Sequence, residues 1–509
     1  MEQKILIIDF GSQYTRLIAR AIRKLKVYCE IHPCTKIPVN FESAKGIIFS
    51  GGLDSVFDPD APNPEFSFLN HDIPVLGVGY GAQYIAKKMG GELIASVRKE
   101  YVSTELSFIA VNNPLMKGIS SGQQVTMSVS DEIMISEKLM DIIAAFNDMQ
   151  NVGFQIKGRR IYGVLFHTDD YAKDEDSVLL KNFVFDICKC EPLWTPASFI
   201  ESAIKEIKNT IGSDNVLLGL SGGVDSSVTA VLMHKAIGRQ LNCVFVNNGL
   251  LRKNEFATVL NTYKDLGLNV NGVDASAKFL KALHGISDPE QKRKAVGKTF
   301  IEVFDDAAHN IPDAHWLAQG TIYPDVIESM PVKGGSASVK SHHNVGGLPD
   351  FMKLKIIEPL KSLFKDEVRQ VGYELGISPL LINRHPFPGP GLAIRILGEV
   401  TAEKVSIVQE ADFIFIQTLK EQNWYEKVWQ AGAILLPVRS VGSTGGERTY
   451  DYVVALRAVG SVDGMTAQWI HLPYDLLELI SNRILKEVKG VNRVVYDISS
   501  KPPATIEWE

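Results

Sequence analysis

The sequence predicts an α/β protein in which two units built on parallel sheets are followed by a smaller α+β module. Short apolar runs at 5–8, 47–49 and 73–78 alternate with helical patterns such as 15–25, the order expected of a parallel sheet covered by helices. A second unit of the same kind starts with the apolar strand pattern 215–220. A length of 509 residues is enough for about three domains.

The remaining elements follow in chain order. Residues 102–166 are richer in short strands and turns, and 188–202 has the composition of a linker that enters a helix. Further strands are predicted at 241–247 and 315–320. The segment "RHPFPGPGL" (384–392) excludes a continuous helix because of its prolines and glycines. Strands at 450–459 and 493–498 and a helix at 475–488 complete the chain. The predicted domains are 1–190, 191–384 and 385–509.

Composition excludes several classes of protein. A net charge of −6, 45% hydrophobic and 22% charged residues are ordinary for a soluble globular protein and argue against a nucleic-acid-coating surface. No apolar stretch of about 18 residues predicts a membrane span. The sequence enters a strand at once, which leaves no room for a signal peptide. Five cysteines indicate no disulfide framework, and Cys188-x-Cys190 lacks the second pair of a zinc site, so we expect a reducing cytoplasm.

The stretch "GVGYGAQ" (77–83) has the pattern of a nucleophile elbow, a sharp turn between a buried strand and a helix. Such a turn lifts one nucleophilic side chain into a pocket near backbone N–H groups. The residue at its apex is Gly79, which has no side chain. The turn is therefore predicted without its nucleophile.

The stretch "SGGVDSS" (221–227) follows a buried strand and opens a helix, which predicts a phosphate-binding loop. Glycines let the backbone approach a ligand closely, hydroxyls supply hydrogen bonds, and the helix N-terminus attracts an anion. Asp225 suits a bound Mg²⁺ that bridges phosphate oxygens. The loop has no Walker lysine, so its chemistry differs from that of kinases and GTPases. The predicted ATP-binding residues are Ser221, Gly222, Gly223, Asp225, Ser226 and Ser227.

With its flanks, this loop resembles the ATP-pyrophosphatase family, and the rest of the chain resembles the GMP synthetase family within it. The motifs that carry the resemblance are 5–15, 288–294, 319–329, 340–349, 358–368, 384–399 and 496–509, spread over nearly the whole chain. The resemblance implies a class I glutamine amidotransferase domain that makes ammonia. It also implies a middle domain that uses ATP and Mg²⁺ to adenylate the C2 oxygen of xanthosine 5′-monophosphate (XMP). The expected C-terminal domain makes a homodimer and helps to bind XMP.

Further site residues follow from the same resemblance. Lys340, Lys365 and Asp366 are expected near the phosphates or the adenylated intermediate, where a lysine neutralises the departing pyrophosphate. His342 and His343, beside Lys340, fit a functional and a structural role equally well. The residues expected to bind XMP are Gln430, Arg448, Lys501 and Glu507.

The chain departs from the family pattern in the amidotransferase domain. The family has a cysteine where this chain has Gly79, and the His-Pro-Glu segment appears as His167-Thr168-Asp169. The Met-Ser-His-Gly-Asp and Gly-Gly-Pro-x-Ser-Val segments appear as "MSVSD" (127–131) and "SGGLDSV" (50–56). Without a thiol no acyl-enzyme can form, so we expect no glutamine hydrolysis.

The C-terminal domain departs as well. Gly432, Gly446 and Gly460 replace larger residues and Thr444 replaces a common methionine, which predicts either a widened nucleotide site or neutral drift in loops. Asn247 replaces an aspartate near the adenine nucleotide. Three interpretations stay open: an ammonia-dependent GMP synthetase, a paralogue that adenylates a different or larger substrate, and a nucleotide-binding regulator without activity. The intact loop favours the two enzymes.

Overall fold

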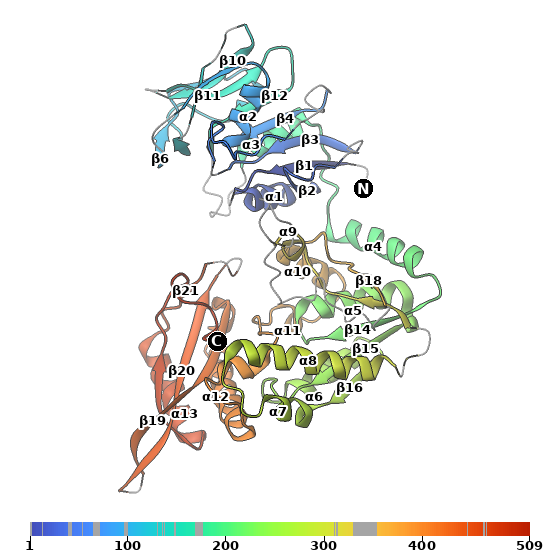
Figure 1. Ribbon diagram of the computed structural model, residues 1–509, viewed down its shortest axis with the longest axis vertical. Helices are drawn as coiled ribbons and strands as arrows, with labels where there is room; N and C mark the ends of the chain where they lie inside the picture. Colours follow the sequence, from blue (N-terminus) through green and yellow to red (C-terminus); the bar gives the residue numbers. More distant parts are fainter. Residues whose placement is uncertain are drawn as a thin grey trace. The chain divides into compact units, whose positions relative to one another are not determined.

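The computed structural model describes residues 3–12, 14–38, 43–52, 54–64, 72–95, 100–129, 131–134, 136, 138–146, 149–167, 177–309, 311, 314–328, 354–444, 446–461, 464 and 466–509 (Figure 1). The chain divides into two compact units. Unit 1 comprises residues 1–199 and 324–340, and unit 2 comprises 200–323 and 341–509.

Unit 1 is built on an eight-stranded sheet in the order β2-β1-β3-β4-β12-β11-β10-β7. The five strands from β2 to β12 pair in parallel, and the remaining three extend the sheet in antiparallel fashion. The strands are β1 Lys4–Asp9, β2 Cys29–Pro33, β3 Ala44–Phe49, β4 Val75–Val78, β7 Phe108–Ile109, β10 Met140–Phe146, β11 Met149–Ile156 and β12 Ile161–Val164. Strand β4 is buried along its whole length, as its apolar sequence predicts.

The remaining elements of unit 1 are shorter. The strands β6 Glu100–Glu105, β8 Gln124–Val129 and β13 Phe166–His167 form a three-stranded sheet, and β5 Glu92–Ile94 pairs with β9 Glu132–Met134. The helices are α1 Thr15–Lys24, α2 Tyr80–Lys88 and α3 Val178–Lys181. Helix α4 Pro196–Ile211 spans the change from unit 1 to unit 2 in the sequence and begins within the predicted linker stretch 188–202.

Unit 2 begins with a five-stranded parallel sheet in the order β16-β15-β14-β17-β18. Its strands are β14 Asn215–Leu220, β15 Leu241–Asn247, β16 Val270–Asp274, β17 Ala314–Ala318 and β18 Lys355–Ile357. Its helices are α5 Val224–Ile237, α6 Glu255–Asp265, α7 Ser276–Leu283, α8 Pro289–Ala308, α10 Lys365–Glu374 and α11 Pro379–Ile382, whereas α9 Tyr323–Glu328 lies in unit 1 except for its first residue. The strand order reverses between β14 and β17, where sheets of this kind bind their ligands.

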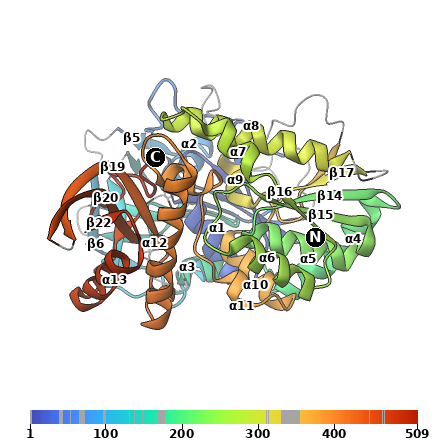
Figure 2. The ribbon, with the colours of Figure 1, turned by 90° about the horizontal axis from the view of Figure 1, so that it is seen from below.

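The last part of unit 2 is a sheet whose centre is the long hairpin of β19 Gln430–Thr444 and β20 Glu447–Gly460. Strands β21 Gln468–Trp469 and β22 Val491–Tyr496 both pair with β20. Helices α12 Ala402–Glu421 and α13 Tyr474–Glu487 pack on this sheet and on each other (Figure 2). The side chain of Thr401 caps α12 by accepting a hydrogen bond from the Lys404 N–H at 3.3 Å.

One hydrophobic core runs through unit 2, from Leu217 and Val244 of the parallel sheet to Phe415, Leu456 and Ile480 of the C-terminal part. The predicted fold class is confirmed: two α/β units on parallel sheets precede an α+β module. The division into domains 1–190, 191–384 and 385–509 stays a prediction. In the part of the chain that the structure describes, no helix is long and apolar enough to cross a membrane.

Candidate active site

The loop "SGGVDSS" lies at the carboxyl end of β14, directly before helix α5. Strand β17 pairs with β14, and the strand order of the sheet reverses between these two strands. Gly320, which follows β17, approaches so closely that a Cβ atom there would lie 3.3 Å from the Ser226 nitrogen. The loop and Gly320 of the "QGTIYPDVIES" motif therefore meet at the crevice in which α/β sheets bind nucleotides.

The serines of the loop hold its backbone in place. The Ser226 hydroxyl lies 3.0 Å from the Ser221 hydroxyl and 3.1 Å from the Gly223 carbonyl oxygen. The Ser227 hydroxyl lies 2.7 Å from the same carbonyl oxygen and 2.8 Å from the Tyr263 hydroxyl. Ser227 is fully buried, so its contribution is to the shape of the loop. Ser221 stays exposed and can contact a ligand.

Lys365, the first residue of α10, lies beside the loop. Its ammonium nitrogen is 2.8 and 2.6 Å from the two carboxylate oxygens of Asp225. The structure thus brings together a predicted catalytic lysine and the predicted magnesium ligand. Asp366 follows in the first turn of the same helix. Lys340, His342 and His343 lie outside the described residues.

The second group of predicted site residues gathers at the start of β19. The Gln430 side-chain amide donates to Glu507 at 2.7 Å, and Arg395 binds both oxygens of the same carboxylate at 2.8 and 3.0 Å. Burial raises the pKa of Glu507, but the Arg395 charge outweighs it, so the pKa is held below its usual range. Glu507 is therefore a buried, fully hydrogen-bonded anion.

Two further charged residues extend this cluster. Asp412 of α12 lies 3.4 Å from Arg395 and 2.8 Å from Arg252, and Arg252 also donates to the Ala431 carbonyl oxygen at 3.0 Å. Both Arg395 and Asp412 have side chains only 2% exposed. Opposite charges alternate through the cluster, which is the arrangement that makes buried charge tolerable.

The expectation that Gly432 widens the nucleotide site is wrong. A Cβ atom on Gly432 would lie 2.3 Å from an Arg395 guanidinium nitrogen, so the arginine already fills the space beside the glycine. At Gly460 a Cβ would lie 3.1 Å from Ile470. Gly446 lies at the far turn of the β19–β20 hairpin, and its added Cβ would meet nothing within 4 Å.

One other predicted XMP-binding residue, Arg448, lies elsewhere on the same sheet. Arg448 pairs with Ser443 near the hairpin turn, and it lies 11 positions along β20 from Val459, the partner of Gln430. At about 3.3 Å per residue the two sites are roughly 36 Å apart, so Arg448 and Gln430 of one chain cannot contact the same nucleotide. The Lys501 ammonium donates to the Gly464 carbonyl oxygen at 2.8 Å.

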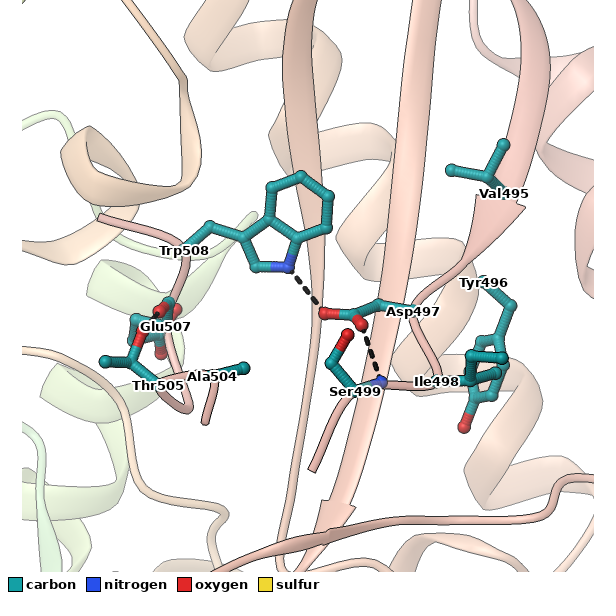
Figure 3. Close-up of a pocket in the computed structure, with 9 residues that line it drawn as sticks. All are labelled: Val495, Tyr496, Asp497, Ile498, Ser499, Ala504, Thr505, Glu507 and Trp508. Atoms are coloured by element: carbon teal, nitrogen blue, oxygen red, sulfur yellow. Dashed lines mark hydrogen bonds between the residues drawn. The ribbon is translucent and has the colours of Figure 1, made fainter. Parts of the chain in front are cut away.

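A cavity of about 470 Å³ lies between the end of β22 and the C-terminal segment (Figure 3). Its polar wall is Asp497, whose carboxylate accepts from the Trp508 indole N–H at 2.8 Å and from the Ser499 N–H at 2.9 Å. Glu507 lines the cavity as well. This volume is typical of a small-molecule site, and Trp508 offers an aromatic face beside hydrogen-bonding groups.

The segment 384–390 connects the loop with the buried cluster. Arg384 donates to the Gly222 carbonyl oxygen at 2.5 Å. The Pro386 carbonyl oxygen accepts from Gln430 at 3.2 Å, and the Phe387 ring lies 5.1 and 5.2 Å from the Arg252 and Arg395 guanidinium carbons. Both predicted parts of the site are therefore tied to one short stretch of chain.

In unit 1, the elbow has the predicted strand–turn–helix geometry. Gly79 lies between β4 and α2 with φ +56° and ψ −119°, the strained turn that this motif requires. A Cβ on Gly81 would lie 2.4 Å from the Phe49 carbonyl oxygen, so that glycine is needed for packing. At Gly79 the nearest atom would be the Gly51 Cα at 3.6 Å, which leaves room for a side chain. The turn is intact and its apex is open.

No other thiol replaces the absent nucleophile. All five cysteines are buried. Cys34, which interacts electrostatically with Tyr80 of the elbow, has its pKa raised to about 11, first by burial and then by Asp9. Burial also raises the pKa of Cys190 to about 11 and that of Cys188. His167 ends β13, whereas Asp169 lies outside the described residues.

Comparison with known proteins finds a family match for three parts of the chain. Residues 6–187 match the family "Glutamine amidotransferase class-I", 197–297 match "NAD synthase", and 417–508 match "GMP synthase C terminal domain". A protein of Cytophaga hutchinsonii named "GMP synthase [glutamine-hydrolyzing]" is 59% identical over 100% of both chains. The chain belongs to the GMP synthase family. Proteins of the same name from Christiangramia forsetii and Porphyromonas gingivalis are 58% and 55% identical, again over 100% of both chains.

For a GMP synthase family member, a bound magnesium ion fits the residues that are present. Asp225 supplies one carboxylate beside a loop suited to phosphates, and Mg²⁺ commonly uses one or two carboxylates with phosphate oxygens and water. Such an ion neutralises phosphate charge. Among the described residues there is no cluster of three or more histidine, cysteine or acidic side chains, so a metal site made by protein ligands alone is not found there.

Sequence reasoning missed the residues that organise the site. They share burial and charge, and they are Arg252, Glu255, Arg384, Arg395 and Asp412. Two of them, Arg384 and Arg395, lie in the motif "RHPFPGPGLAIRILGE". There, an arginine at each end of a rigid apolar segment is the sequence pattern that could have indicated site residues. Glu255 and Asp412 lie in helices and Arg252 lies in the turn before α6, and their local sequence does not distinguish them from exposed residues.

Proposed function

We propose that this chain is an ATP-dependent ligase that converts XMP to GMP with free ammonia and has no glutaminase activity of its own. In the first step the C2 oxygen of XMP attacks the α-phosphorus of ATP and pyrophosphate leaves. In the second step ammonia attacks C2 and AMP leaves with the oxygen. The family supports the ligase, and the geometry of the elbow supports the absence of glutaminase.

The observation that carries the ligase proposal is the juxtaposition of loop and lysine. The backbone at 221–223 and the N-terminus of α5 offer N–H groups for the leaving pyrophosphate. Lys365, which lies on Asp225, places a positive charge where that pyrophosphate gathers negative charge. Asp225 is the proposed magnesium ligand.

The acceptor nucleotide is assigned to the C-terminal part of unit 2. Gln430 and Glu507 form one hydrogen-bonded pair there, and the adjoining cavity has room for a nucleobase. Because Arg395 fills the space beside Gly432, the structure offers no enlargement there for a bulkier acceptor than XMP.

The absence of glutaminase rests on Gly79 and on the buried thiols. Glutamine hydrolysis by a class I amidotransferase needs a thiolate at the elbow. Here the apex carries no side chain, and Cys34, Cys188 and Cys190 have raised pKa values. The curated relatives carry "glutamine-hydrolyzing" in their names, so on this point the proposal departs from them.

The proposal includes a cytoplasmic homodimer. The β19–β20 hairpin exposes Val438, Val441 and Tyr450, each by more than half, and a second copy of the chain would cover such a surface. Light scattering after size-exclusion chromatography is expected to give twice the chain mass of 56.2 kDa. A mass of one chain would contradict the dimer.

The test measures GMP and pyrophosphate in the presence of ATP, Mg²⁺ and XMP, with ammonium or with ammonia-free glutamine as the nitrogen source. We expect GMP with ammonium and none above background with glutamine. The Lys365→Ala variant serves as the control, because it removes the charge beside the loop and should lose most of the activity with ammonium.

Each other outcome decides a different point. Turnover with glutamine at the ammonium rate would contradict the interpretation of the elbow. Pyrophosphate release only with another acceptor would favour the paralogue with a different substrate. No release with any acceptor would favour a nucleotide-binding regulator.

A further inference from the structure

Arg384 lies between the phosphate loop and helix α6. One guanidinium nitrogen donates to the Gly222 carbonyl oxygen at 2.5 Å, and another contacts Glu255. The second Glu255 oxygen accepts from the Arg252 N–H at 2.8 Å, and the Glu255 side chain is only 5% exposed. Glu255 thus fixes the arginine and compensates its charge.

The contact determines how one peptide group of the loop is turned. In a trans peptide the carbonyl and the N–H point in opposite directions. While Arg384 holds the Gly222 carbonyl oxygen, the Gly223 N–H is turned the other way, toward the Ser221 hydroxyl at 3.3 Å. An anion in the loop is attracted by a backbone N–H and repelled by a carbonyl oxygen, so this orientation favours phosphate.

Gly222 is matched to this arginine. Its φ of +73° is a conformation that favours glycine, and a Cβ there would lie 3.2 Å from the Arg384 nitrogen. Any larger residue would press against the guanidinium group and strain the loop. The glycine and the arginine, 162 residues apart in the sequence, act as a pair.

We propose that Arg384, held by Glu255, is a positioning residue for the pyrophosphate part of ATP: it fixes the Gly222–Gly223 peptide so that the carbonyl oxygen is turned away and the N–H lies on the side of the exposed Ser221 hydroxyl, where the phosphates would bind. The inference rests on the proposed function, since it assumes that the loop binds ATP. Its role is distinct from that proposed for Lys365, whose charge beside Asp225 would neutralise the departing pyrophosphate.

The test is calorimetric binding of ATP with Mg²⁺, without XMP, to the full chain and its variants. Arg384→Ala is expected to weaken ATP binding at least about tenfold, the usual effect of losing a hydrogen bond from a charged group. Arg384→Lys should recover part of the loss, because an ammonium still donates to one carbonyl. Binding of AMP, which leaves the pyrophosphate region empty, should change less than about twofold.

Arg483→Ala is the matched control, since that arginine of α13 makes ion pairs with the half-exposed Glu421 and Glu487 and should leave both affinities unchanged. If Arg384→Ala does not fold, Arg384→Lys and Glu255→Gln carry the test, and in both the loss of ATP binding is expected to exceed the loss of AMP binding. Unchanged ATP binding, or equal losses for ATP and AMP, would overturn the inference. Failure of the unmodified chain to bind ATP would instead contradict the proposed function.

Discussion

Replacing Gly79 with cysteine tests whether the elbow of unit 1 is both intact and open. The new side chain would have its nearest neighbour, the Gly51 Cα, at 3.6 Å, so no steric conflict is expected. The backbone angle φ of +56° disfavours any residue with a Cβ, and we expect a loss of about 1–3 kcal/mol in the stability of unit 1.

The reactivity of the new thiol can be estimated from its position. Because residue 79 is the N-cap of α2, the helix should keep its thiol pKa at or below the ordinary value of about 8.5. The native Cys34 has a pKa of about 11. At pH 8 the thiolate population at position 79 is therefore on the order of 200-fold larger. Lower intrinsic nucleophilicity of the less basic thiolate removes about tenfold, which leaves an advantage of roughly twentyfold.

The assay is the rate of reaction of the native protein with a chromogenic disulfide reagent between pH 6 and pH 9. Gly90→Cys is the matched control, because Gly90 also has a positive φ of +87°, is exposed, and follows the opposite end of the same helix. We expect Gly79→Cys to react at a lower pH midpoint than Gly90→Cys. Labelling no faster than the native cysteines, or the same midpoint for both variants, would refute an open elbow at a helix N-terminus.

Three predictions concern unit 2. Burial lowers the pKa of His385 to about 4, so the folded state does not take up the proton that the unfolded state binds below about pH 6.5. The free energy of unfolding should therefore fall by up to about 3 kcal/mol from pH 7 to pH 4. In urea titrations the His385→Gln variant should lose this fall, and the same fall in the variant and the unmodified protein would contradict the assignment to His385. Gly432→Ala should lower the stability of the fold by about 1–3 kcal/mol and raise the KM for XMP, because the added methyl group displaces Arg395. An unchanged thermal unfolding temperature together with an unchanged KM would contradict the close contact between Gly432 and Arg395. The ammonium of Lys292, fully buried, contacts Glu509 at 2.5 Å. Lys292→Met should lower the free energy of chemical unfolding by about 3 kcal/mol, because it leaves the Glu509 carboxylate without its cation. Adding Glu509→Gln to this variant should restore part of the lost stability. If the two substitutions instead lower stability additively, the two side chains do not interact.

Local patterns predicted the sheets and both turns because each depends on residues close in sequence. The local backbone conformation follows from the apolar strand before Gly79 and from the glycines and serines after Leu220. Strand, turn and helix therefore lie where the sequence predicts them. Burial of charge is different, since it needs partners from distant segments. Arg395 meets Glu507 across 112 residues, and no pattern near either residue indicates the pairing.

The two alternatives that the sequence left open at Gly432 have a related cause. A missing side chain in the sequence suggests empty space, but in a closely packed interior another group takes that space. Here the occupant is Arg395, which reaches Gly432 from a different element. The effect of a small residue therefore depends on its neighbours in the fold, which one sequence does not show.

The segment from Arg384 to Arg395 has a consequence for how two reactants could be kept at a constant separation. Its first end holds the phosphate loop and its second end holds Glu507. Between them Pro386, Pro388 and Pro390 restrict the backbone, so this stretch has little freedom to lengthen or shorten. If the proposed sites are occupied as inferred, the stiffness of this segment would set the distance between the ATP that donates the adenylyl group and the nucleotide that accepts it.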